Sequence, residues 1–108
     1  MIRNYTDYIA DIRYHGRNYH FRFKITKSDS DGFRAYIVVA PSYGSRSTSL
    51  HATHRLRDSN GHYFCWNSRI DSLGAMKAVA QLWTKATVMY IADGGSSLDA
   101  HAERLRNA

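Results

Sequence analysis

An alternation of apolar and polar residues near the N-terminus constrains the fold more than any other feature of the sequence. Every second residue is apolar or aromatic in two stretches, residues 8–14 and residues 19–25. A period of two with many aromatic residues is typical of β-strands that bury one face. Between the stretches, a two-residue loop at Gly16 and Arg17 fits a type II′ turn, in which glycine comes first. This loop predicts an antiparallel hairpin whose inward pairs are all apolar or aromatic: Tyr14–Tyr19, Ile12–Phe21, Ala10–Phe23 and Tyr8–Ile25, with Asp11 opposite Arg22 on the outward side.

Three more strands are expected in the middle of the chain. Residues 33–40 alternate again, and Pro41 ends this strand because proline cannot donate to the ladder. Residues 42–49 are rich in serine and glycine and are expected to form a mobile basic loop that carries Arg46. Residues 50–57 and 62–67 then predict a second hairpin. The inward and outward sides of these strands are predicted as follows: Phe33, Ala35, Ile37, Val39, Leu56, Tyr63 and Cys65 inward, and Arg55, Arg57, Phe64 and Trp66 outward.

The C-terminal half predicts one long helix, at residues 72–92. Its apolar residues recur at helical spacing over most of the surface, so the helix is expected to pack on the sheet. Asp71 or Ser72 can cap its start, and Gly94 can end it in the left-handed conformation. Ser96 with Asp99 predicts the start of a short last helix over residues 98–107.

The predicted fold is therefore an α+β single domain over residues 1–108. It has about five antiparallel strands in a twisted sheet, with one face packed on the long helix and a short C-terminal helix. The order of strands followed by a helix resembles, in outline, the single-stranded DNA-binding coactivator fold. That resemblance concerns the fold alone and implies no site residue.

Composition limits the partners and the compartment. No apolar run reaches the roughly 20 residues needed to cross a bilayer, and the N-terminus lacks the apolar region of a signal peptide. Cys65 is the only cysteine, so no disulfide can form within the chain, which favours a reducing, cytoplasmic location. Lys and Arg total 15 against 9 Asp and Glu, and the resulting charge of +6 favours an anionic partner such as nucleic acid.

A metal site is suggested only by the spacing of His51, His54, His62 and Cys65. Residues three apart on a strand point to opposite faces, so the predicted strands separate these ligands and leave His54 beside Cys65 alone. No nucleophile elbow and no glycine-rich cofactor loop stands out. We therefore predict no catalytic residue, no cofactor and no metal, and expect that the protein is not an enzyme.

The candidate binding site is the outward face of the predicted sheet, where basic and aromatic residues alternate. Cations neutralise phosphates and exposed rings stack on bases, so this combination suits single-stranded nucleic acid. Ile9 and Val38 also point outward, which leaves open that the last helix or a second copy covers part of the face. The candidate residues for nucleic-acid or partner binding are Arg13, Arg22, Lys24, Arg34, Arg46, Arg55, Arg57, Phe64 and Trp66, with His20, Lys27 and Tyr36 nearby.

Three functions compete for such a chain. The first is a non-enzymatic binding or inhibitor protein that engages a nucleoprotein complex, because small basic chains without catalytic residues are common among phage and mobile-element accessory proteins, including inhibitors of CRISPR and restriction systems. The second is a direct single-stranded DNA- or RNA-binding protein that uses the outward face. The third is a structural or oligomeric module, with a homodimer as its simplest form. The first is our leading hypothesis.

Overall fold

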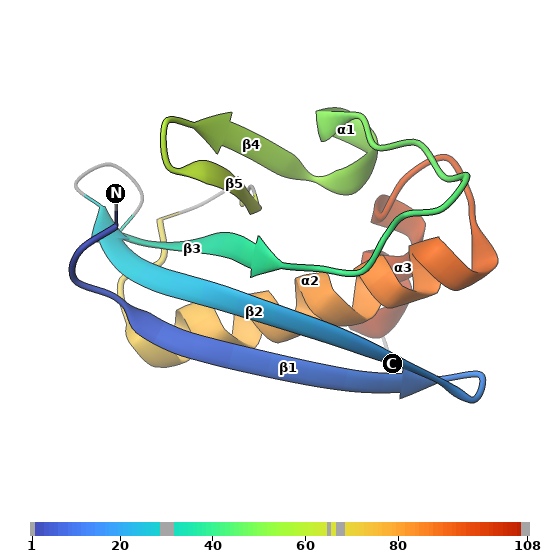
Figure 1. The fold of residues 1–108 in the computed structure, drawn as a ribbon, viewed down its shortest axis with the longest axis horizontal. Helices are drawn as coiled ribbons and strands as arrows, with labels where there is room; N and C mark the ends of the chain where they lie inside the picture. The colour runs from blue at the N-terminus through green and yellow to red at the C-terminus, as the bar shows by residue number, and fades with distance from the viewer. Residues whose placement is uncertain (1, 29–31, 65, 67–68, 107–108) are drawn as a thin grey trace.

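The computed structural model describes residues 2–28, 32–64, 66 and 69–106, without the side chains of Arg104 and Arg106. It confirms the α+β class: five antiparallel strands form one sheet in the order β1-β2-β3-β5-β4, and β1 and β4 lie at its two edges (Figure 1). No helix of the described residues is long and apolar enough to cross a membrane. The elements are β1 Thr6–Tyr14, β2 Arg17–Ser28, β3 Gly32–Val39, α1 Leu50–Thr53, β4 Arg55–Asp58, β5 Gly61–Phe64, α2 Leu73–Asp93 and α3 Asp99–Arg106.

The N-terminal hairpin is confirmed, but its predicted register is wrong by two residues. The loop is His15-Gly16, so Tyr14 pairs with Arg17 and Ile12 pairs with Tyr19. Both loop residues have positive φ, 50° at His15 and 77° at Gly16, as a type I′ turn requires. Histidine enters this left-handed region more readily than most residues. A shift of two residues leaves every side chain on its predicted face, so the inward side is unchanged.

A β-bulge changes the end of β3. Phe23 pairs with Ile37 and the neighbouring Arg22 pairs with Val39, so Val38 is the extra residue. Val39 therefore turns to the same side as Arg22 and is 41% exposed, and its predicted inward position is wrong.

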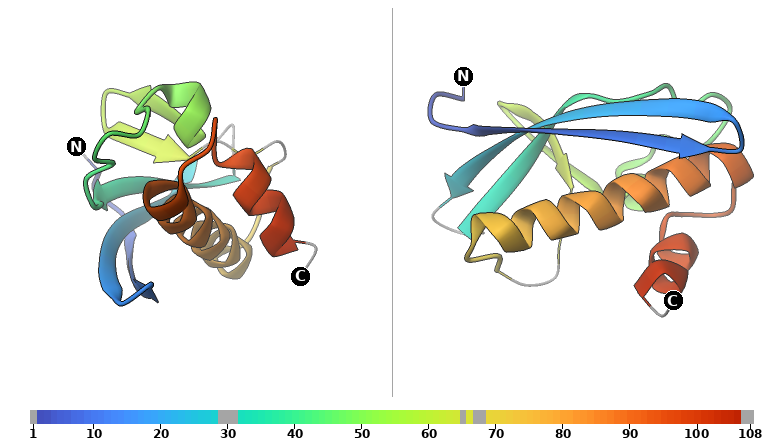
Figure 2. Two further views of the ribbon diagram at one scale, coloured as in Figure 1. Left: turned by 90° about the vertical axis from the view of Figure 1, so that its right-hand side faces the viewer. Right: turned by 90° about the horizontal axis from the view of Figure 1, so that it is seen from below.

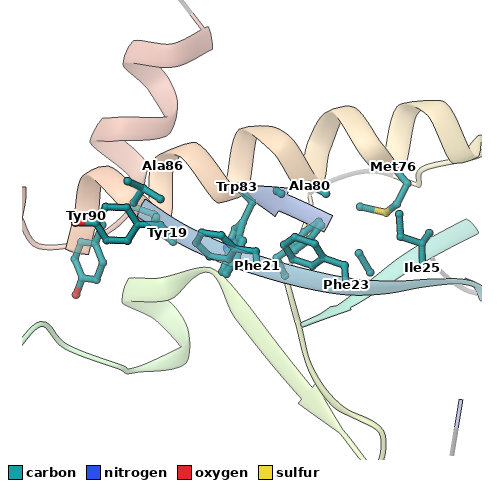
Figure 3. Packing of buried hydrophobic residues seen from close by; sticks show 14 of the residues in the cluster. Tyr19, Phe21, Phe23, Ile25, Met76, Ala80, Trp83, Ala86 and Tyr90 are labelled. Carbon is teal, nitrogen blue, oxygen red and sulfur yellow. The ribbon is translucent and has the colours of Figure 1, made fainter. Parts of the chain in front are cut away.

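The core lies between the sheet and α2 (Figure 3). Of the two predicted caps, Ser72 is the one that caps α2, with its side chain accepting a hydrogen bond from the Ala75 amide at 3.1 Å. Trp83 lies at the centre of the core, edge-on to Phe21 and to Phe23, with each pair of ring centroids 6.0 Å apart. These contacts confirm that the long helix packs on the inward face.

Part of the second predicted hairpin is not a strand. Residues 50–53 form the short helix α1, which starts at Ser49 with its side chain accepting from the Ala52 amide at 3.1 Å. His54 then reverses the chain with φ of 51°, and β4 begins at the next residue. The indole nitrogen of Trp83 donates to the Thr53 carbonyl at 3.1 Å, so a contact with α2 holds α1 in place.

The last helix packs on α2, on the side away from the sheet (Figure 2). It starts one residue later than predicted, because Ser97 rather than Ser96 accepts from the Asp99 amide, at 3.2 Å. Leu98 is 2% exposed, and the buried ring of His101 hydrogen-bonds the Gly94 carbonyl at 2.8 Å. The helix α2 and the helix α3 lie on the same side of the sheet, and α1 contacts Trp83 of α2 and the Leu98 amide before α3, so no described helix covers the opposite face.

Candidate partner-binding surface

The side of the sheet away from α2 is called the outer face below. Strand pairing places one row of side chains straight across it, with one residue from each strand. The row runs across the sheet in the order Asp7, Lys24, Tyr36, Tyr63 and Leu56. Basic, aromatic and apolar groups therefore lie side by side on one surface.

Beside this row, Arg34 is held by a compact polar cluster. Its Nη1 donates to Asp58 Oδ2 at 2.9 Å and to the Tyr36 hydroxyl at 3.3 Å. The Tyr36 hydroxyl donates to the same carboxylate at 2.5 Å, and the guanidinium lies 4.0 Å from the ring centroid of Tyr63. The hydrogen bond from Tyr36 is the largest cause that lowers the pKa of Asp58; the Asn60 amide and Arg34 add to it, while burial opposes it. Asp58 thus stays ionised at neutral pH and fixes the direction of Arg34.

Two adjoining hollows, of about 370 and 430 Å³, form one groove that we call the Tyr36 groove. The segment before β1 borders it because the Thr26 hydroxyl donates to the Asn4 carbonyl at 2.8 Å and Lys24 Nζ lies 4.5 Å from the Tyr5 ring centroid. The lining contains four cationic side chains and one carboxylate, which makes the groove electropositive. Its lining residues are Ile2, Arg3, Lys24, Thr26, Lys27, Ser28, Arg34, Tyr36, Ile37, Val38, Asp58, Ser59 and Asn60.

Towards the His15-Gly16 turn, polar and charged side chains of the outer face contact one another. Arg22 contacts Asp7 at 3.0 Å, and His20 contacts Asp11 at 2.6 Å. Arg13 donates to a side-chain oxygen of Asn18 at 3.3 Å. This part of the face is therefore of mixed charge. The exposed apolar side chains on the outer face are Ile9, Val38, Val39 and Leu56.

The structure brings only part of the predicted site together. Arg22, Lys24 and Arg34 lie on the central strands of the outer face, as expected, and Arg13 lies on the same face near the hairpin turn. Trp66 is 40% exposed but lies after β5 rather than within it.

The predicted outward position of Phe64 is wrong. Phe64 is 5% exposed and stacks on Trp83, with ring centroids 5.5 Å apart and 20° between the planes. The facing of β4 and β5 is thus the reverse of the prediction, and Tyr63 and Leu56 point outward in place of Phe64 and Arg55. The predicted inward position of Cys65 lies outside the described residues.

Two of the predicted binding cations, Arg46 and Arg55, do not lie on the outer face and instead make hydrogen bonds that stabilise the fold. Arg46 donates to the carbonyl groups of Ile91 and Ala92, each at 3.1 Å, and so caps the end of α2. It therefore anchors its loop, which was expected to be mobile.

Arg55 donates to the Thr53 hydroxyl at 2.8 Å and to the Thr48 carbonyl at 2.9 Å, and so secures α1. Arg57 is exposed on the edge strand β4. It is two residues after Arg55, so the two side chains point to the same side of the strand.

Sequence reasoning missed Arg3, Asp58 and Tyr63. The signal for Tyr63 was weak, because Tyr63 and Phe64 are both aromatic and either could face the core. In the sequence, Asp58 reads as a turn residue. In the structure it is the last residue of β4, and its carboxylate lies on the outer face.

Possible metal ligands do not gather in the described part of the chain, where no three His, Cys, Asp or Glu side chains form a set that could hold an ion. His54 instead contacts Asp99 at 2.5 Å. The pKa of His62 is lowered, mainly by burial and then by the charges of Arg55 and Arg57. Cys65 lies outside the described residues.

No family model, curated protein or solved structure matches the chain. The outer face and its groove are the features from which a function can be inferred.

Proposed function

We propose that this protein is a small, non-enzymatic, cytoplasmic binding protein that engages a nucleoprotein complex, in the manner of phage or mobile-element inhibitors of CRISPR or restriction systems. The observation that carries the proposal is the electropositive Tyr36 groove, which opens on the same face as the exposed apolar residues Ile9, Val38 and Val39. A partner made of nucleic acid and protein offers both phosphate groups and apolar surface to such a face.

The groove has the chemistry of a phosphate-binding surface. Proteins contact phosphate oxygens through Lys and Arg and through Ser, Thr and Asn side chains. Lys24, Lys27 and Arg3 supply charge, and Thr26 and Asn60 supply polar groups. The net charge of +6 also attracts a polyanion before contact.

The apolar part of the outer face suits a protein surface better than a nucleic acid. Asp7, which pairs with Arg22, and Asp11, which contacts His20, place two carboxylates there, and this makes the region less favourable for phosphates than the groove. Exposed aliphatic residues between paired charges are compatible with a protein contact, which buries apolar area and needs complementary charge.

Direct binding of a single strand through stacked bases is the alternative function. It has less support on this face, because stacking needs exposed rings. Tyr36 is only 5% exposed, the guanidinium of Arg34 covers Tyr63, and Phe64 is in the core. The exposed rings of Trp66 and Tyr5 support this alternative, and an oligomeric module is the third candidate.

The test measures phage plating on bacterial strains that carry defined CRISPR or restriction systems and express this protein. The groove variant is Lys24→Gln/Lys27→Gln. Its matched control is Lys77→Gln/Lys85→Gln on α2, since each pair has one half-buried and one exposed lysine and loses two charges. We expect the wild type and the control to restore plating in at least one strain and the groove variant to fail. Plating that no strain recovers, or that the groove variant restores fully, would contradict the proposal.

Binding to naked nucleic acid separates the alternative from the leading proposal. Fluorescence anisotropy with labelled single-stranded DNA, single-stranded RNA and duplex DNA is measured at two salt concentrations. Tight, salt-dependent binding to single strands that the groove variant weakens, without any effect on plating, would favour the alternative.

A further inference from the structure

The edge strand β1 has the features of a dimer interface. It is nine residues long, contains no proline or glycine, and pairs with β2 without a bulge. No strand of the described residues pairs with its other edge. The opposite edge of the sheet, β4, has only four residues. A long, regular edge strand is a template for another strand.

We propose that β1 pairs antiparallel with β1 of a second copy of this chain, with the two-fold axis at Ala10, to form one continuous sheet. This dimer does not depend on the proposed function. It places α2 of both copies on one side of the sheet and both outer faces on the other, so each Tyr36 groove stays open.

The backbone is suited to this pairing. In an antiparallel ladder, the peptide groups of alternate residues point to opposite edges of the strand. The two-residue loop makes Tyr14 and Arg17 a hydrogen-bonded pair, so the even-numbered residues of β1 bond to β2. The peptide groups that point to the open edge therefore belong to the outer-face residues Asp7, Ile9, Asp11 and Arg13. With the axis at Ala10, these residues meet only one another.

Charges on the outer face favour this register over the two neighbouring ones. With the axis at Ala10, Asp7 lies opposite Arg13 of the second copy, and by symmetry the same pair occurs twice. An axis at Ile9 would place Asp7 opposite Asp11 twice, and an axis at Asp11 would place the two Asp11 carboxylates opposite each other. Opposite charges across a ladder stabilise it and like charges destabilise it. Only the Ala10 register of these three matches opposite charges, and it pairs all nine residues of β1.

The inner side is complementary in the same register. Tyr8 lies opposite Ile12 of the second copy, again twice, and the small Ala10 meets itself at the axis. Tyr8 and Ile12 are half-buried at the sheet edge and already pack on the core. The dimer would extend that core across the edge.

A charge exchange between Asp7 and Arg13 tests the proposal. Sedimentation velocity measures the association of the wild type, of Asp7→Arg and of Arg13→Asp up to near-millimolar concentration. Each variant alone would place two like-charged pairs across the axis, whereas an equal mixture restores two opposite pairs. We expect a dimeric wild type, a dissociation constant raised roughly tenfold to a hundredfold in each variant alone, and a dimer again in the mixture.

Arg17→Asp is the matched control for Arg13→Asp, because it makes the same change of charge at an exposed position on β2 rather than on β1. It should leave the dimer intact. Circular dichroism establishes that each variant is folded. A wild type that stays monomeric at the highest concentration would show that the charges on β1 only guard an edge. A dimer that neither single variant weakens, or a mixture that does not associate, would exclude this register.

Discussion

Replacing Phe64 with alanine removes a ring from the centre of the core. Phe64 stacks on Trp83 and meets Phe23 edge-on, with that second pair of ring centroids 5.9 Å apart at 82°. Loss of a buried phenylalanine lowers the free energy of unfolding by about 3–5 kcal/mol. Two ring contacts, each worth about 0.5–1.5 kcal/mol beyond buried area, place the expected loss in the upper half of that range.

The neighbouring Tyr63→Ala is the matched control. Tyr63 lies on the other face of the same strand and is half-buried under Arg34. Its removal forfeits one cation–π contact and one edge contact with Tyr36, so we expect a loss below about 2 kcal/mol. Phe64→Leu keeps most of the buried volume and should fall between the two.

Urea unfolding followed by tryptophan fluorescence measures these losses. A shift of the unfolding midpoint without a change in the dependence of the free energy on urea concentration reports a change in stability. Trp83 lies against the altered side chain and reports the change directly. An equal loss for Phe64→Ala and Tyr63→Ala, or a larger loss for Tyr63→Ala, would refute the assignment of Phe64 to the core and of Tyr63 to the outer face.

Three further predictions concern single contacts. Arg46→Ala should lower the free energy of unfolding by about 1–3 kcal/mol, since two carbonyl groups at the end of α2 lose a charged donor. Thermal unfolding measures this loss, and a variant as stable as the wild type would contradict the capping role. Ser72→Ala should cost about 1 kcal/mol in the same assay through loss of the N-cap of α2. The pKa of Asp58 lies below its ordinary value of 3.8, so this group stabilises the fold above that pH and the stabilisation disappears as pH falls through the lower, folded-state pKa. The stability difference between wild type and Asp58→Asn should therefore shrink in acid, and a difference that is constant down to pH 2 would contradict the assignment.

The sequence alone determined which residues share a face in the N-terminal hairpin and where α2 lies. Alternation over residues 8–14 and 19–25 leaves one arrangement that buries the aromatic residues, and this holds although the register moved by two. The long helix was equally well specified, because Ser72 and Gly94 bound an apolar surface at helical spacing. These signals are local, so a single chain segment contains them.

Tertiary structure decided the composition of the candidate site. Tyr63 and Phe64 are both aromatic, so alternation gave no contrast between them, and the proximity of Trp83 buried Phe64. Arg46 reads as a surface cation in sequence, yet the end of α2, 45 residues further on, supplies its partners. Contacts between segments far apart in the chain leave no periodic trace in either segment. For that reason the sequence determined the N-terminal hairpin and the long helix, whereas only the folded chain determined α1 and which cations and rings meet on the outer face.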